Sequence, residues 1–128
     1  MEFYHTTVTE HPFDEAIYVV TEALKKEGFG VLTSIDIAAK MKEKLDVTMG
    51  RYTILGACNP PLAHKALTIE KRIGVMLPCN VIVRETPEGT VEVSSIDPMA
   101  SMAAVGNESL TAVAEEVSRK LKSVIDSL

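Results

Sequence analysis

The side chains best suited to chemistry in this chain are two thiols, and an asparagine follows each of them. Cys58 precedes Asn59 in the sequence. The second thiol, Cys79, lies 21 positions later and precedes Asn80. A thiolate is a nucleophile and a metal ligand, and a carboxamide both donates and accepts hydrogen bonds. Asp97 adds a carboxylate further along the chain. These five residues are our candidates for a ligand-binding site.

The first of the two thiols lies directly before a predicted helix start. Asn59 can accept a hydrogen bond from an unpaired amide of the first turn, and Pro60 occupies a position whose amide has no partner. A thiol at this position meets the positive end of the helix dipole, which favours the thiolate. We therefore expect Cys58 to be unusually reactive.

A predicted hairpin brings the second thiol toward the carboxylate. Thr86 and Thr90 flank a three-residue turn that ends in Gly89, a common hairpin length. If Thr86 pairs with Thr90, counting back along both strands places Cys79 opposite Asp97, although a bulge would shift this register by one residue. Together with the two asparagines, these groups would form a small polar cluster at the rim of an otherwise apolar sheet.

The distance between the two thiols depends on how their strands run. If the strand that ends at Cys58 is antiparallel to the strand that starts at Cys79, both sulfur atoms lie at one end of the sheet. A parallel crossover would separate them by about 20 Å, because a seven-residue strand rises about 3.3 Å per residue. The short connecting helix favours the parallel arrangement.

Three interpretations of these residues remain open. In the structural interpretation both cysteines are small buried hydrophobes, and Asn59 and Asp97 only cap helices. In the second interpretation the cluster is a ligand or anion pocket. In the third it is a metal-binding or redox thiol pair, which is the least favoured because zinc needs three or four ligands. Only His64 could add to the two thiols, and it is expected to face solvent.

The sequence gives no indication of catalytic residues, metal ligands or a cofactor. No histidine is placed beside either cysteine by its spacing, so a thiol nucleophile would lack an obvious base. His5 and His11 are expected at the surface. Met99 and Met102, which are interspersed with alanines, are interpreted as packing or dimer contacts rather than as part of a cofactor site.

The elements that would position the candidate residues follow from apolar periodicity and capping signals. Strands are expected at residues 3–8, 29–33, 52–58 and 75–86, with the hairpin partner of the last strand leading to Asp97. Helices are expected to begin at His11-Pro12, at Ser34 or Asp36, at Asn59-Pro60, at Asp97-Pro98 and at Asn107. The helix after Asn59 should show an apolar stripe at Leu62, Ala66, Ile69 and Ile73.

Two of these elements have the clearest patterns. Residues 52–58 are nearly continuous in apolar or small side chains, which is typical of a central strand that is buried on both faces. The last helix keeps an apolar stripe over five turns and carries charged residues on its opposite face. The apolar residues of that stripe are Leu110, Val113, Ala114, Val117, Leu121, Val124, Ile125 and Leu128.

Length and composition are those of an ordinary folded domain. A chain of 128 residues, of which 46% are hydrophobic and 24% charged, can bury a core as a single domain, 1–128. It has no run long enough to span a bilayer and no signal-peptide pattern, so we expect a cytoplasmic protein whose two cysteines stay reduced. The net charge of −5, without clustered Lys and Arg, argues against nucleic acid as a partner.

Four motifs in this order resemble a known family. They are residues 28–33 (GFGVLT), 55–63 (LGACNPPLA), 77–83 (LPCNVIV) and 95–98 (SIDP). The chain resembles, over nearly its whole length, the bacterial and archaeal family called domain of unknown function 302. The resemblance implies an α+β fold like that of the TATA-binding protein, in which helices, including a long C-terminal one, pack on one face of a curved, largely antiparallel sheet.

The resemblance also implies a homodimer and favours the antiparallel arrangement of the two thiol-bearing strands, but it supplies no activity. DNA binding does not follow from the fold, because function depends on the site and this chain is acidic. The leading hypothesis is a small cytosolic ligand-binding protein with a site near Cys58, Cys79 and Asp97. The alternative is a homodimeric interaction module whose thiols are merely structural.

Overall fold

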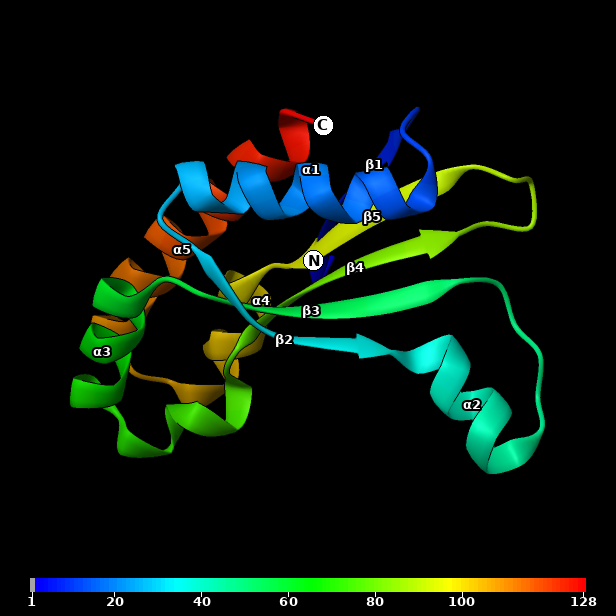
Figure 1. The fold of residues 1–128 in the computed structure, drawn as a ribbon. Helices are drawn as coiled ribbons and strands as arrows, with labels where there is room; N and C mark the ends of the chain where they lie inside the picture. The colour runs from blue at the N-terminus through cyan, green and yellow to red at the C-terminus, as the bar shows by residue number, and fades with distance from the viewer. Residues whose placement is uncertain (1) are drawn as a thin grey trace.

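The fold is built on a five-stranded sheet in which every neighbouring pair of strands is antiparallel. The structure is a computed structural model that describes residues 2–128. The strand order is β1-β5-β4-β3-β2, so β4 lies at the centre (Figure 1). The strands are β1 (Tyr4–Thr9), β2 (Gly30–Asp36), β3 (Tyr52–Cys58), β4 (Cys79–Glu85) and β5 (Val91–Ile96).

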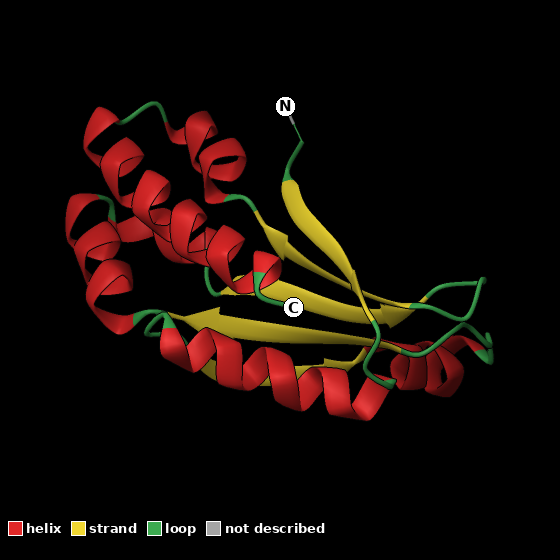
Figure 2. Cartoon of the chain, turned by 90° about the horizontal axis from the view of Figure 1, so that it is seen from above, coloured by secondary structure: helices red, strands yellow, loops and turns green. Residues whose placement is uncertain are grey.

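Two long helices lie on the same face of this sheet (Figures 1 and 2). They are α1 (Phe13–Lys26), which contacts β2 and β4, and α5 (Glu108–Asp126), which contacts β1 and β5. The shorter elements are α2 (Ile37–Leu45), α3 (Pro60–Ile69), the 3-10 helix η1 (Lys71–Met76), α4 (Pro98–Met102) and the 3-10 helix η2 (Ala103–Val105). The predicted α+β class, with helices on one face and a long C-terminal helix, is confirmed.

The core lies between the sheet and these helices. Side chains that alternate along a strand point to opposite faces, and on β4 the residues Cys79, Val81 and Val83 are the buried set. They belong to the same apolar cluster as α1, which contacts β4, and as the stripe of α5, in which the seven predicted residues from Leu110 to Ile125 are all buried. One continuous apolar cluster results, so the two thiol-bearing strand ends are held by the main core.

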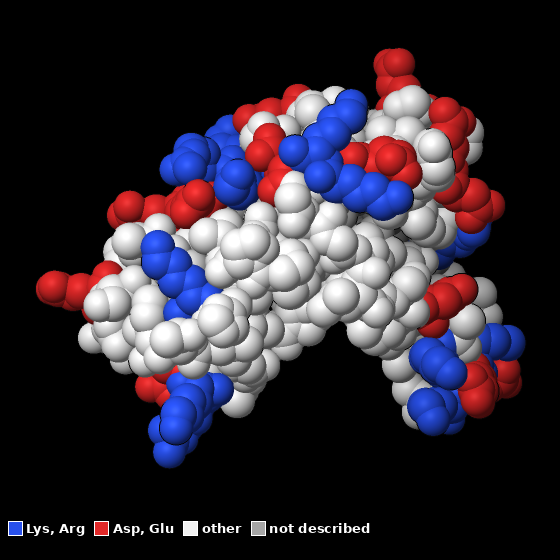
Figure 3. All heavy atoms as spheres, turned by 60° about the vertical axis from the view of Figure 1, so that its left-hand side comes forward, with Lys and Arg blue, Asp and Glu red and all other residues white. Residues whose placement is uncertain are grey.

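The other face of the sheet has no helix layer. On that face Ile35, Ile54 and Ile82 form a row across β2, β3 and β4, and Ile35 is exposed. The helix α2 projects from the edge of the sheet beyond β2 and buries none of its residues. In the space-filling view the molecule is hollowed on this side (Figure 3), and beside Ile82 this face carries the ion pair of Arg84 on β4 with Glu92 on β5.

Helix capping agrees with the sequence signals. Asp36 is the cap of α2 and accepts a hydrogen bond from the Ala39 N–H at 2.9 Å. The predicted caps Asn59, Asp97 and Asn107 each accept a bond from the first turn of the following helix. Because these caps fix where the helices begin, they also fix where β3 and β5 must end.

Three predicted boundaries or environments were wrong. The stripe expected from Leu62 to Ile73 is not one α-helix, because α3 ends at Ile69 and the chain tightens into η1, where the Ile73 N–H bonds the Glu70 carbonyl three residues back. Consequently, the strand expected from residue 75 begins only at Cys79. β3 is an interior strand but not the central one, and only one of its faces is covered by helices.

Candidate functional site

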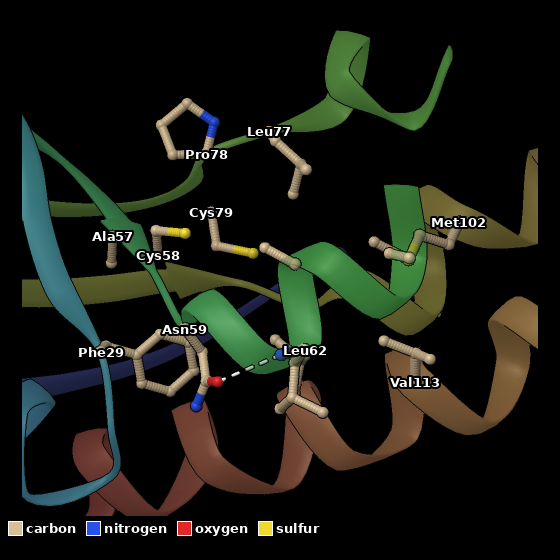
Figure 4. Close-up of a pocket in the computed structure, with 13 residues that line it drawn as sticks. Phe29, Ala57, Cys58, Asn59, Leu62, Leu77, Pro78, Cys79, Met102 and Val113 are labelled. Carbon is tan, nitrogen blue, oxygen red and sulfur yellow. Dashed lines mark hydrogen bonds between the residues drawn. The ribbon is translucent and has the colours of Figure 1, made fainter. Parts of the chain in front are cut away.

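The pairing of β3 with β4 brings the two cysteines to the same end of the sheet. The strands are antiparallel, and Ala57 pairs with Cys79, so Cys58 at the end of β3 lies beside the start of β4. Both thiols line one cavity, and Figure 4 shows their sulfur atoms directed to the same side, toward α3. The antiparallel arrangement is therefore confirmed, and the prediction that the thiols are neighbours is correct.

The cavity lies between this end of the sheet and the helices α3, α4 and α5. Its free space measures about 20 Å³, which is about the room that one water molecule needs. Most of its wall is hydrocarbon from side chains distant in sequence, namely Phe29, Leu62, Leu77, Met102, Val113 and Val117. The cavity is thus small and apolar, and the two thiols form part of its lining.

Access to the cavity lies beside the first thiol. Cys58, Ala63, Leu77 and Pro78 line the cavity and are only half-buried. The wall formed by α5 is fully buried by contrast. A small molecule would therefore enter between the end of β3 and the segment that leads into β4.

The two thiols lie in different environments. Cys79 is 7% exposed, and burial raises its pKa from 9.0 to about 11, with a smaller contribution from the electrostatic interaction with Cys58. Desolvation acts in this direction because the thiolate is charged and the thiol is not. Cys79 is therefore a neutral thiol at physiological pH, and the predicted special reactivity of Cys58 stays a prediction.

Asn59 lines the cavity, but its polar atoms are bound by the protein itself. The Leu62 N–H donates to its Oδ1 at 3.3 Å, as Figure 4 shows, and its Nδ2 donates to the Glu27 carbonyl at 3.2 Å. The second bond ties the loop after α1 to the start of α3. Asn59 therefore supports the cavity wall, with one hydrogen bond at each end of its side-chain amide.

Asn80 does not take part in the cavity. It follows Cys79 on β4, and adjacent strand residues point to opposite faces. Its Cα pairs with Gly56 on β3, and its side chain is exposed. The prediction that both asparagines contribute to the site is wrong for Asn80, because its neighbour Cys79 faces the core.

Asp97 continues the predicted register but is not a cavity residue. The pairing of Val81 with Ser95 fits the count that opposes Cys79 to Asp97, although the ladder ends there and the Asp97 N–H bonds the Phe3 carbonyl instead. Its carboxylate turns to other partners, so the predicted polar cluster of thiols, amides and carboxylate does not form.

The carboxylate of Asp97 holds three elements together. It accepts hydrogen bonds from the Met99 N–H of α4 at 3.0 Å and from the Ser118 Oγ of α5 at 2.8 Å. The His5 Nε2 of β1 lies 3.2 Å from the same Ser118 Oγ and 3.9 Å from the Asp97 Oδ2. In a catalytic triad the histidine stands between the serine and the acid, whereas here Ser118 occupies that position. The arrangement is a structural tie.

Two residues that shape the cavity had no clear signal in the sequence. Met102 lines it, although the sequence placed this residue only in packing or a dimer contact. Pro78 packs on Gly56, where an added Cβ would lie 2.7 Å from the Pro78 Cγ and would also clash with Thr33 Oγ1. This close approach positions the start of β4 and hence Cys79.

The remaining features of the described chain limit the possible functions. Within residues 2–128, no three His, Cys, Asp or Glu side chains form a group that could hold a metal ion. His64 is exposed, as expected. No helix in the same part of the chain is long and apolar enough to cross a membrane.

Comparison with known proteins agrees with the fold and the motifs. The family model described as "Domain of unknown function DUF302" matches residues 4–128. The crystal structure of an uncharacterized conserved protein DUF302 from Bacillus stearothermophilus superimposes with a TM-score of 0.93 and 28% sequence identity, covering 98% of each chain. No curated protein matches the chain significantly. The chain belongs to the DUF302 family, whose function is unknown.

Proposed function

We propose that this protein binds a small, uncharged ligand in the cavity that Cys58 and Cys79 share. The observation that carries the proposal is the meeting of two thiols, 21 positions apart in sequence, in one apolar cavity at the rim of the core. Binding sites are typically apolar hollows with few polar groups that set orientation. Here the sulfur atoms are the groups that remain available.

The chemistry of the wall defines the kind of ligand. A charged group would lose its hydration without gaining a charged partner, which costs several kcal/mol, because no Asp, Glu, Lys or Arg of the described chain lines the cavity. Apolar and polarizable groups meet no such penalty against thiols and hydrocarbon. The small free volume favours a ligand of a few atoms, or a small group that enters beside Cys58.

The proposal places the protein in the cytoplasm. Both cysteines are free thiols in the structure, and the cytosol keeps thiols reduced. A thiol-lined cavity would stay open to its ligand there.

Alkylation kinetics test whether the cavity admits apolar molecules at Cys58. An uncharged apolar maleimide should react with native Cys58 at least about tenfold faster than a charged maleimide, when each rate is divided by its rate on the unfolded chain. A63V should lower this preference because its side chain fills the cavity. K65V is the matched control, because it introduces the same β-branched side chain, and therefore the same loss of helix propensity, on the exposed side of α3.

Equal reactivity toward the two reagents would contradict the proposal. If the charged and uncharged reagents show the same normalised rate in the native chain, the cavity does not select apolar molecules. Loss of the preference in K65V as well as in A63V would show that the effect comes from α3 stability and not from the cavity.

A second candidate function, a homodimeric interaction module, is favoured by the open face of the sheet. A nine-residue helix is too short to be stable alone, yet α2 buries none of its residues within the chain. The row Ile35, Ile54 and Ile82 lies on the uncovered face of the sheet, which Figure 3 shows as hollowed. A second copy of the chain would cover this surface and α2 together.

Sedimentation velocity tests the dimer. The wild-type chain should sediment as a dimer, and I82K should shift it to a monomer, because a lysine would be buried without a partner. A112K, which places the same charge on the exposed side of α5, should remain a dimer. A monomeric wild-type chain at high micromolar concentration would rule out this candidate.

A further inference from the structure

A second hollow lies on the open face of the sheet, away from the cavity that the two thiols share. This open-face hollow is lined by side chains of β1, β3, β4 and β5 and by Phe3, which precedes β1. On β4 its lining residues Ile82 and Arg84 alternate with the core residues Val81 and Val83, so they point to the opposite face. Its free space of about 370 Å³ is within the range of small-molecule pockets.

Aromatic rings are concentrated at this hollow. The chain has three phenylalanines, three tyrosines and no tryptophan, and half of these rings, Phe3, Tyr4 and Tyr52, line the hollow. Phe3 and Tyr4 meet edge to face with their ring centroids 5.0 Å apart, and Phe3 remains 68% exposed. Tyr52 comes from β3, which β5 and β4 separate from β1. Rings therefore flank the hollow on both sides.

An ion pair forms the polar part of its floor. Arg84 donates from Nε and Nη2 to the two carboxylate oxygens of Glu92, at 2.9 and 3.2 Å. The Ser94 hydroxyl donates to the same carboxylate at 3.4 Å and lies 2.8 Å from the Thr6 hydroxyl. A guanidinium has more N–H donors than these two bonds use, and a carboxylate has further lone pairs. The pair can therefore still donate to a ligand and accept from it.

The charges and the rings together define the kind of ligand. Because Arg84 and Glu92 neutralise each other, a ligand of either charge would be attracted to one partner, repelled by the other and deprived of part of its hydration. A flat ring, in contrast, stacks on aromatic side chains and on the plane of a guanidinium. An edge with both a donor and an acceptor matches the two polar groups.

We propose that the open-face hollow binds an uncharged, planar heteroaromatic molecule, with Phe3, Tyr4 and Tyr52 against its ring and Arg84 and Glu92 on its polar edge. Stacking combined with hydrogen bonds to a ring edge is how proteins hold single nucleobases. This inference goes beyond the proposed function, because the hollow and the thiol-bearing cavity share no lining residue. The other possible occupant of this face is a second copy of the chain, which would bury the hollow.

Quenching of 2-aminopurine fluorescence measures binding, since this base is uncharged and planar and loses emission when it stacks on an aromatic ring. The wild-type chain should quench it saturably. Y52L keeps an apolar side chain but removes the ring, and it should weaken binding by at least about fivefold, as expected for the loss of one stacked ring. Y18L is the matched control, because Tyr18 is an exposed tyrosine of α1 that does not line the hollow; its affinity should match wild type.

Competition with charged rings tests the role of the ion pair. Adenine should displace 2-aminopurine from the wild-type chain, whereas benzoate and benzyltrimethylammonium should need much higher concentrations. E92Q keeps the shape of the side chain but leaves Arg84 as an unpaired cation, so it should improve the competition by benzoate relative to adenine by about fivefold, the upper range for a partly exposed charge pair. E115Q removes an exposed charge on α5 and should leave this ratio unchanged.

Several results would overturn the proposal. One is the absence of saturable quenching by the wild-type chain, including the case in which sedimentation shows a dimer that buries the hollow. Another, which needs no variant to fold, is competition by either charged ring as effective as that by adenine. Equal affinity of Y52L and wild type, or an unchanged ratio in E92Q, would also contradict it. None of these results bears on the cavity at Cys58, whose alkylation is measured separately.

Discussion

At the scale of residues, Cys58 and Cys79 share a cavity but differ in their surroundings. Cys79 is buried among core residues, and that burial makes its thiolate unfavourable. Cys58 is half-buried at the point where the cavity meets the surface. The pair therefore combines one inert thiol that belongs to the core with one thiol that an incoming molecule meets first.

The raised pKa of Cys79 predicts a loss of stability at alkaline pH. The folded chain keeps the Cys79 proton up to about pH 11, whereas the unfolded chain loses it near 9.0. The stabilising contribution is therefore complete below pH 9 and falls as the pH rises toward 11. Its size is roughly 2–3 kcal/mol, at about 1.4 kcal/mol per pKa unit.

Urea unfolding between pH 8 and 11 checks this prediction in wild type and C79A. The difference in unfolding free energy between the two chains should shrink over this range, because C79A has no thiol to ionise there. Other groups that titrate at alkaline pH are common to both chains and cancel. A difference that stays constant from pH 8 to 11 would show that Cys79 is not desolvated as described.

The close contact between Gly56 and Pro78 predicts that a larger residue at position 56 destabilises the chain. A methyl group at this position would lie 2.7 Å from the rigid ring of Pro78 and would also clash with Thr33. G56A should therefore destabilise the chain by about 1–3 kcal/mol, as overpacking does. G30A on the neighbouring strand is the control, because nothing lies within 4 Å of an added Cβ there.

Thermal unfolding measures the stability of each variant, and mass spectrometry after alkylation measures the reaction rate of Cys58. G30A should match wild type within about 0.5 kcal/mol, and G56A should also change the Cys58 alkylation rate because Pro78 lines the cavity. If G56A is as stable as G30A, then the contact between Gly56 and Pro78 does not position the start of β4.

At the scale of elements, the ends of helices and strands determine which side chains can meet. The cap at Asn59 ends β3, and the tie between Asp97 and Ser118 fixes α4 against α5. Since Met102 is the last residue of α4, this tie also sets the position of one cavity wall. Asp97 thus influences the cavity by holding α4 in place, and it does not itself line the cavity.

Variants of Asp97 test this indirect role. D97A removes the cap of α4 and the acceptor for Ser118, and it should destabilise the chain by about 1–3 kcal/mol. D97N keeps an oxygen acceptor and should lose less than half as much. Urea unfolding gives both values.

The reagent preference of Cys58 in D97N separates the structural role of Asp97 from a direct role in ligand binding. If Asp97 took part in the site directly, D97N would abolish the preference of Cys58 for uncharged reagents even where the variant is as stable as wild type. The structural tie predicts that D97N retains this preference.

Element-level patterns in the sequence were sufficient for most of the fold. The apolar stripe of the last helix, the Asn59-Pro60 cap and the turn between Thr86 and Thr90 depend on neighbours close in sequence, and each is confirmed. The transition from α3 to η1 was missed because the apolar stripe continues through Ile73, which is buried in the 3-10 segment as well.

The site was predicted only in part, because its composition depends on contacts far apart in sequence. The proximity of the cysteines follows from strand direction, which the residues alone left open. The partner of Asp97 is Ser118, 21 residues away on α5, and no local pattern indicates it. The error at Asn80 could have been avoided, since adjacent strand residues face opposite sides of a sheet.

At the scale of the whole molecule, the two faces of the sheet have different roles. The covered face holds the core and the thiol-lined cavity at one end, between β3, β4 and the helices. The open face and α2 expose apolar residues such as Ile35 and Leu45 without a second layer. A ligand site and a surface for a second copy can therefore coexist without competing for the same residues.

The most direct test of the shared cavity is the native mass of the intact chain, purified from cells without added ligand. Our account predicts a small noncovalent adduct on wild type that disappears under denaturing conditions, and that is absent from A63V but present on K65V. An unliganded wild-type chain, or an adduct that A63V retains, would contradict the claim that the cavity between Cys58 and Cys79 is a ligand site.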